Sequence, residues 1–126
     1  MGTQNVVAGV LNAKNPPRLV YNSSSSVYHV SMDGAPFTEE SPLPDFSTLD
    51  EYCKNKILCE RYILGQAQNG GNFQFIVFRL ATVGGLSARM RIDLLPNHFT
   101  YAAVTIGKLS LANSGDQRAV IDINLM

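Results

Sequence analysis

Apolar and polar residues alternate most clearly between Phe73 and Leu94. In this stretch the run FQFIVFRLATV is separated from LSARMRIDL by Gly84-Gly85. Glycine accepts the positive φ angles that a two-residue hairpin turn requires, so the pattern predicts a β-hairpin that turns at these glycines. Counting outward from the turn then gives the register of the two predicted strands.

The predicted register gives the hairpin two unlike faces. One face carries mostly apolar pairs, such as Val77 with Ile92, and is predicted to pack on the core. On the other face, three large apolar side chains lie opposite three charged ones. Burying the charges is costly, whereas exposing the apolar side chains leaves an apolar stripe. The sequence therefore predicts a half-exposed interface made of Ile76, Phe78, Leu80, Arg89, Arg91 and Asp93.

Short apolar runs separated by turn residues extend this all-β interpretation along the chain. Further strands are predicted at residues 4–11, 18–22, 26–32, 57–64, 99–106, 108–112 and 117–125. One short helix is predicted near residues 48–56, where Thr48 and Glu51 have the spacing of a capping box. The predicted fold class is thus an antiparallel β-sandwich or β-barrel of about eight or nine short strands with this one helix, as a single β domain over residues 1–126.

Residues 35–46 form a long segment without an apolar period. Their sequence, APFTEESPLPDF, holds three prolines and three carboxylates, which is typical of a surface loop. Two alternatives to an interface between chains would also explain the mixed hairpin face. This loop and the following helix could fold over it, or it could bind a ligand or nucleic acid. The acidic residues lack the spacing and the central glycine of an EF-hand, so no metal site is predicted.

The charge balance argues against a general nucleic-acid binder. Ten basic and ten acidic residues give a formal net charge of zero, whereas such binders carry an excess of basic residues. A neutral chain also repels its own copies weakly, which favours self-association. No apolar run approaches the ~20 residues of a membrane span. The sequence therefore predicts a soluble chain, with the virion or the cell surface as candidate locations.

No motif in the sequence specifies a catalytic centre. His29 and His98 are the only histidines, and neither adjoins a nucleophile signature. Gly70-Gly71 does not stand in the strand-to-helix context of a dinucleotide fingerprint. The only two cysteines are predicted to be free thiols, with a local disulfide as the alternative. No catalytic residue, cofactor or metal ligand is therefore predicted.

These observations predict a non-enzymatic domain for assembly or recognition. Its expected partner is a second copy, as in a homodimer, or another protein, bound through the mixed hairpin face. Proteins of this class include viral structural proteins, such as a protruding capsid domain, and surface modules, and the chain is compared with them by analogy. A module that binds a glycan or small ligand is the alternative, and a small enzyme is the third hypothesis.

Overall fold

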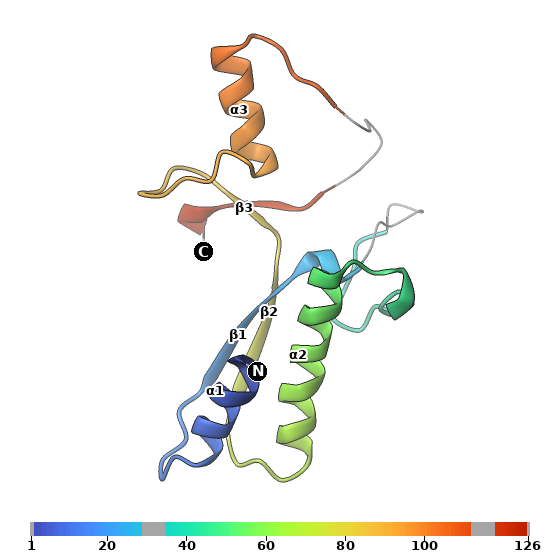
Figure 1. Cartoon of the computed structure of the whole chain (residues 1–126), viewed down its shortest axis with the longest axis vertical. Helices are drawn as coiled ribbons and strands as arrows, with labels where there is room; N and C mark the ends of the chain where they lie inside the picture. The colour runs from blue at the N-terminus through green and yellow to red at the C-terminus, as the bar shows by residue number, and fades with distance from the viewer. Residues whose placement is uncertain (1, 29–34, 112–117, 126) are drawn as a thin grey trace. The chain divides into compact units, whose positions relative to one another are not determined.

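The structure is a computed structural model that describes residues 2–28, 35–111 and 118–125 (Figure 1). Three short 3-10 helices occur in these ranges: η1 (Ser25–Tyr28), η2 (Phe46–Thr48) and η3 (Ile123–Leu125). The longer elements are α1 (Gly2–Leu11), β1 (Leu19–Ser24), α2 (Glu51–Gln68), β2 (Phe75–Leu80), β3 (Thr82–Gly84), α3 (Leu95–Thr105) and β4 (Val120–Asp122). The chain divides into two compact units, Met1–Leu80 and Ala81–Met126.

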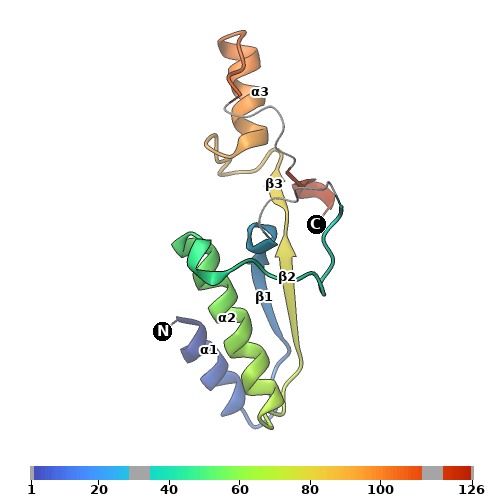
Figure 2. The ribbon, with the colours of Figure 1, turned by 90° about the vertical axis from the view of Figure 1, so that its right-hand side faces the viewer.

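The first unit is built on a strand–helix–strand arrangement. β1 and β2 pair in parallel, with Tyr21 opposite Val77, and α2 lies in the connection that a parallel pair requires. Helix α1 contacts α2, and both helices lie on the same side of the two strands (Figure 2). One face of this small sheet is therefore covered by helices.

The length and position of α2 follow from its buried side chains. Cys53, Ile57, Glu60 and Ile63 are buried and stand three or four residues apart, which is the spacing of one helix face. Asp50 caps the helix, because its side chain accepts a hydrogen bond of 2.7 Å from the backbone N–H of Cys53. The buried face of α2 thus joins the main apolar cluster, which contains Val27, Tyr28, Leu49, Cys53 and Ile57.

In the second unit, Gly84 and Gly85 do not form the turn of a hairpin. β3 pairs in parallel with β4, and α3 contacts β3. A Cβ atom on Gly84 would lie only 2.8 Å from Cγ of Pro96, in the first turn of α3, and Gly85 has a φ of 113°. Asn97 accepts a hydrogen bond from the N–H of Gly85 and donates one to the carbonyl of Arg91. Close approach and a left-handed backbone therefore account for these glycines.

The predicted all-β fold class is wrong, since the chain is a mixed α/β protein. The four short strands in its described residues pair in parallel. Residues 4–11, 57–64 and 99–106, predicted as strands, coincide with parts of α1, α2 and α3. Their β-branched and aromatic content favoured strands, yet their buried residues follow a helical period, as Val7 and Val10 do in α1. Tertiary packing therefore outweighs local propensity in these runs.

The predicted hairpin is also wrong. Its first half forms β2 and β3, which pair with β1 and β4, and residues 86–94 contain no strand. Phe78 stands opposite Asn22, not opposite Arg91. The predicted alternation along β2 is confirmed, because Phe75 and Val77 are half-buried whereas Ile76 and Phe78 are exposed.

Several smaller predictions have mixed outcomes. The strand at residues 18–22 is confirmed as β1, and residues 35–45 contain no helix or strand, as a loop requires. The helix predicted near residues 48–56 exists, but it begins at Glu51 and continues to Gln68. Residues 29–32 of another predicted strand lie outside the described residues, and its residues 26–28 belong to η1. The single domain over residues 1–126 stays a prediction.

Candidate functional site

The carboxyl end of β1 is attached to the first turns of α2. Lys56 Nζ donates a hydrogen bond of 2.7 Å to the carbonyl of Asn22. Cys53 Sγ donates one of 3.3 Å to the carbonyl of Ser26, in the turn that follows Ser24. In open parallel sheets, ligands bind outside the carboxyl ends of the strands. This end of β1 is therefore where a functional site is expected.

Lys56 lies between two tyrosine rings at this position. Its Nζ is 5.2 Å from the ring centroid of Tyr21 on β1 and 5.6 Å from that of Tyr52 on α2. Both distances are within the range in which a cation is attracted to an aromatic ring. Tyr52 precedes Lys56 by four residues, so both side chains lie on one face of the helix. A positive charge is thereby held beside two phenols.

The two phenols have different surroundings. Tyr21 is half-buried, and burial, followed by hydrogen bonding with the Cys59 side chain, raises its pKa far above the ordinary value. Tyr21 therefore stays neutral at physiological pH. Tyr52 is 54% exposed, so its hydroxyl is open to a ligand from solution. Of the two, only Tyr52 is placed to exchange a proton with a bound molecule.

Serine hydroxyls gather at the same end of β1. Ser24 is half-buried, and its Oγ accepts a hydrogen bond of 3.2 Å from the N–H of Ser26. Ser23 is buried, and within the described part of the chain its Oγ has no hydrogen-bond partner. The run of serines at residues 23–26 thus brings hydroxyl groups close to the carboxyl end of the strand.

A largely buried ion pair holds the neighbouring turn. Arg79 on β2 donates to Glu60 on α2 at 2.7 Å, through Nη2, and to the hydroxyl of Tyr28 at 2.7 Å, through Nη1. The hydrogen bond with Glu60 is the largest cause of the raised pKa of Arg79. Phe37 stacks on the Tyr28 ring with 5.1 Å between the centroids. This network joins β2, α2 and η1, so it fixes the turn that follows Ser24.

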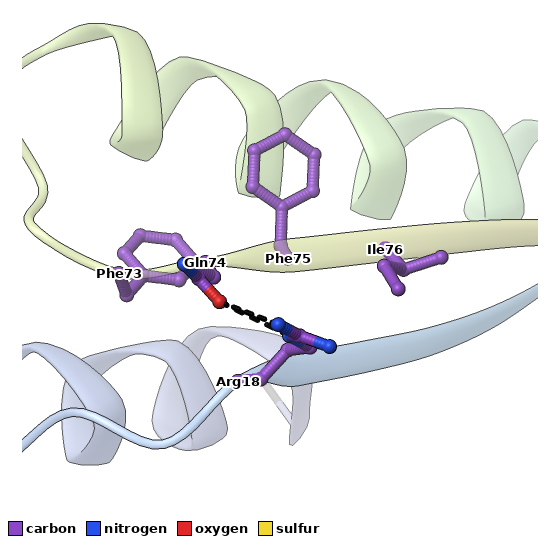
Figure 3. A pocket seen from close by; sticks show the side chains of 5 residues that line it. All are labelled: Arg18, Phe73, Gln74, Phe75 and Ile76. Atoms are coloured by element: carbon purple, nitrogen blue, oxygen red, sulfur yellow. Dashed lines mark hydrogen bonds between the residues drawn. The ribbon is translucent and has the colours of Figure 1, made fainter.

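A shallow pocket lies at the opposite end of the strands. Figure 3 shows its lining residues, with Phe73, Gln74, Phe75 and Ile76 on or just before β2 and Arg18 just before β1. Arg18 Nη2 donates a hydrogen bond of 2.8 Å to Oε1 of Gln74. The pocket is therefore at the amino ends of β1 and β2, away from the end at which Tyr52 and Lys56 meet.

The six residues predicted to form an interface fall in both units: Ile76, Phe78 and Leu80 in the first, Arg89, Arg91 and Asp93 in the second. Phe78 is exposed on β2. Arg91 pairs with Asp93 at 2.5 Å and lowers the pKa of that carboxyl. Strand pairing does not bring the two sets together, so their contact with a second copy stays a prediction. Light scattering of the chain and of a Phe78→Asp variant tests it.

Side chains of the types that can bind metal ions are dispersed among the described residues. Within residues 2–28, 35–111 and 118–125, no group of three or more His, Cys, Asp and Glu side chains is placed to hold a metal ion. Cys53 is a buried free thiol and Cys59 a half-buried one, so the predicted free thiols are confirmed. None of the helices described is long and apolar enough to cross a membrane.

The sequence reasoning missed Tyr52 and Lys56 as a pair. Both residues lie in the helix predicted near residues 48–56, but the spacing of four residues between Tyr52 and Lys56 was not interpreted. A helix that continues through Lys56 puts both side chains on one face.

A comparison with protein families finds one model that covers nearly the whole chain. This model, described as the NAD dependent epimerase/dehydratase family, matches residues 1–120 of the 126. The match contradicts the predicted non-enzymatic function, the viral capsid or surface module, and the alternative of a glycan-binding module. The reason for the error is that the mixed face of the predicted hairpin favoured an interaction domain, whereas Tyr52 and Lys56 were not considered together.

Proposed function

Because this chain belongs to the NAD dependent epimerase/dehydratase family, we propose that it supplies the acid–base residues of an enzyme. The proposed proton-transferring residue is Tyr52, and Lys56 supports it. The proposed substrate is a small molecule that presents a hydroxyl or carbonyl oxygen at the carboxyl end of β1.

Both reactions in the description of the family require proton transfer. Epimerisation inverts a carbon centre, and dehydration removes a hydroxyl group as water. Each needs a group that takes up a proton and returns it. The exposed Tyr52 Oη donates its proton to a carbonyl or departing hydroxyl oxygen, and as a phenolate it accepts a proton from a hydroxyl group.

The position of Lys56 is the observation that carries this proposal. Its ammonium nitrogen is 5.6 Å from the centroid of the Tyr52 ring and is held by a 2.7 Å hydrogen bond to the carbonyl of Asn22. A fixed positive charge stabilises the negative charge that develops on the phenol oxygen when its proton leaves. The hydroxyl of Ser24, at the end of β1, adds a group that can hydrogen-bond a substrate oxygen.

The described residues do not fit the dinucleotide that the family name implies. Dinucleotide-binding proteins hold the pyrophosphate on a glycine-rich turn between a strand and the N-terminus of a helix. Gly70 and Gly71 instead follow the C-terminal end of α2, and Gly84 and Gly85 lie well before α3. Neither α2 nor α3 begins on such a turn. We therefore assign no step to NAD and limit the mechanism to Tyr52 and Lys56.

The reactivity of Tyr52 toward an aryl sulfonyl fluoride tests the proposal without a cofactor. The phenol oxygen attacks sulfur, fluoride leaves, and the phenol proton passes to solvent. Tyr101 on α3 is the internal reference, because it is 46% exposed and the described residues show no cation over its ring. We expect Tyr52 to be labelled about five times faster than Tyr101, which corresponds to roughly 1 kcal/mol of stabilisation by Lys56.

Two lysine variants make the result specific. Lys56→Met should bring the labelling rate of Tyr52 down to that of Tyr101. Lys54→Met is the matched control, because Lys54 is on the same helix but pairs with Glu51 at 2.9 Å, and it should leave the rate unchanged. If Lys56→Met leaves Tyr52 as reactive as before, the proposed acid–base pair is wrong.

A further inference from the structure

The ammonium group of Lys56 is placed by neighbours on β1, not by α2 alone. A lysine side chain has four rotatable bonds, and its charged end normally extends into water. Here the carbonyl of Asn22 accepts its hydrogen bond, and the ring of Tyr21 lies closer to Nζ than the ring of Tyr52 does. The adjacent β1 residues Tyr21 and Asn22 therefore determine where the charge lies.

Tyr21 is well anchored for such a role. It lies in the middle of β1, opposite Val77 of β2, and its side chain is half-buried. Its hydroxyl interacts with Cys59, and Cys59 Sγ accepts a hydrogen bond of 3.3 Å from Oγ1 of Thr3 on α1. Pairing with β2 and the contact with Cys59 on α2 thus hold Tyr21, whereas Tyr52 is exposed.

We propose that Tyr21 is a positioning residue that holds the Lys56 ammonium group beside Tyr52. The proposal deepens the function proposed above and rests on it. The two tyrosines have different roles: the half-buried, neutral Tyr21 orients the cation, and the exposed Tyr52 exchanges the proton. Loss of the Tyr21 ring leaves Lys56 with one anchor on β1, the carbonyl of Asn22, and allows its charge to move away from Tyr52.

Two substitutions separate the ring of Tyr21 from its hydroxyl. Tyr21→Phe keeps the ring and removes the contact with Cys59, whereas Tyr21→Leu removes the ring. The first measurement is the upfield ring-current shift of the Lys56 methylene next to Nζ, followed by NMR of the full chain with 13C-labelled lysine. The second is the rate at which an aryl sulfonyl fluoride labels Tyr52, with Tyr101 as the reference.

We expect Tyr21→Phe to preserve both the upfield shift of the Lys56 methylene and the labelling rate of Tyr52. Tyr21→Leu should remove a large part of the upfield shift and slow the labelling of Tyr52 about twofold to fivefold, the range that a partly exposed cation–ring contact allows. Val77→Ala is the control for general loosening, since Val77 is the β2 residue opposite Tyr21. This variant should leave the labelling rate of Tyr52 unchanged.

The outcomes distinguish this inference from the proposed function. An unchanged Lys56 shift in Tyr21→Leu overturns the inference. So does a slower labelling of Tyr52 in Val77→Ala that equals the effect of Tyr21→Leu, because packing would then be the cause. A third outcome is that Tyr21→Leu changes the chemical shift of the Lys56 methylene, while neither Tyr21→Leu nor Lys56→Met slows the labelling of Tyr52. In that case Tyr21 positions Lys56, but the proposed acid–base function is wrong.

Discussion

The two compact units of this chain differ most in how much apolar surface they bury. In Met1–Leu80, Val7, Val27, Ile57 and Ile63 are almost completely buried. In the described part of Ala81–Met126, the buried residues are Gly84, Asn97 and Ala102, whereas large apolar side chains such as Leu86 and Val104 are more than 80% exposed. The first unit thus contains the apolar core.

The candidate site lies in the unit that contains this core. Tyr52 and Lys56 are held by a helix with a buried face and by the neighbouring strand. Acid–base residues must be held within a fraction of an ångström of their working geometry, and buried neighbours provide that rigidity. A two-stranded sheet with little buried surface, such as that of β3 and β4, is only marginally stable. The proposed proton transfer is therefore expected to take place in the first unit.

The largest expected effect comes from core substitutions in the first unit. Ile57→Ala should lower the free energy of unfolding by about 3 kcal/mol, because Ile57 is 1% exposed and its removal leaves a cavity. Val104→Ala, on the exposed side of α3, should change it by less than about 0.5 kcal/mol. Urea unfolding measures both values. Similar losses in the two variants would show that the units do not differ as described.

The ion pairs of the two units provide the next test. Arg79→Met should lower the free energy of unfolding by roughly 3 kcal/mol, because it leaves Glu60 largely buried without its partner. Arg91→Met, which breaks the exposed pair with Asp93, should cause no measurable change.

A double variant checks that the loss comes from an unpaired charge. Glu60→Met combined with Arg79→Met should recover most of the stability that Arg79→Met removes, because no charge then stays buried. Chemical denaturation of the single and double variants measures the recovery. If the double variant is as unstable as the single one, packing by the Arg79 side chain explains the loss instead of the ion pair.

Local patterns in the sequence predicted β1 and the two faces of β2. Side-chain alternation in a strand depends only on neighbouring residues, so Ile76 and Phe78 were correctly placed on one face, which is exposed in the structure. The partner of β2 was not predictable in the same way, because β1 is far away along the chain and a parallel pair leaves no turn signal between its strands. The paired glycines favoured the nearer, antiparallel partner.

The candidate site was missed because Tyr52 and Lys56 were not considered as a pair, although both lie in the helix predicted near residues 48–56. The continuation of that helix was predicted as a strand. The run ILCERYIL fits a period of two as well as a helical period over so short a distance. The structure decides between them, since Ile57, Glu60 and Ile63 are buried at intervals of three residues, which a period of two does not give. Once residues 51–68 are helical, Tyr52 and Lys56 share a face. The approach of Tyr21 to Lys56 is a tertiary contact that no local pattern contains.

A smaller and more local effect is expected in the second unit. Asn97→Ala should remove the hydrogen bonds to the N–H of Gly85 and the carbonyl of Arg91, at a cost of about 1–2 kcal/mol. Amide hydrogen exchange should become faster at Gly85 and stay unchanged in α2. Faster exchange throughout α2 would contradict the division into two units.

The smallest effect concerns the cap of α2 and depends on pH. The backbone N–H of Cys53 donates to the Asp50 carboxylate and lowers its pKa. A carboxyl whose pKa is lower in the folded chain stabilises that chain above its unfolded pKa, about 3.9 for aspartate. The stabilisation is lost as the pH falls from there through the folded pKa. Asp50→Ala should therefore lower the melting temperature at pH 7 and have little effect near pH 2.

Asp93 is the matched residue for this comparison. The exposed pair with Arg91 also lowers its pKa, yet its partner is a mobile surface side chain instead of the end of a helix with a buried face. Asp93→Ala should therefore leave the melting temperature unchanged at both pH values, because exposed ion pairs contribute little to stability. Asp93→Ala could instead lower the melting temperature at pH 7 as much as Asp50→Ala does. Attachment to the core of the first unit would then not explain why the Asp50 carboxylate stabilises the fold.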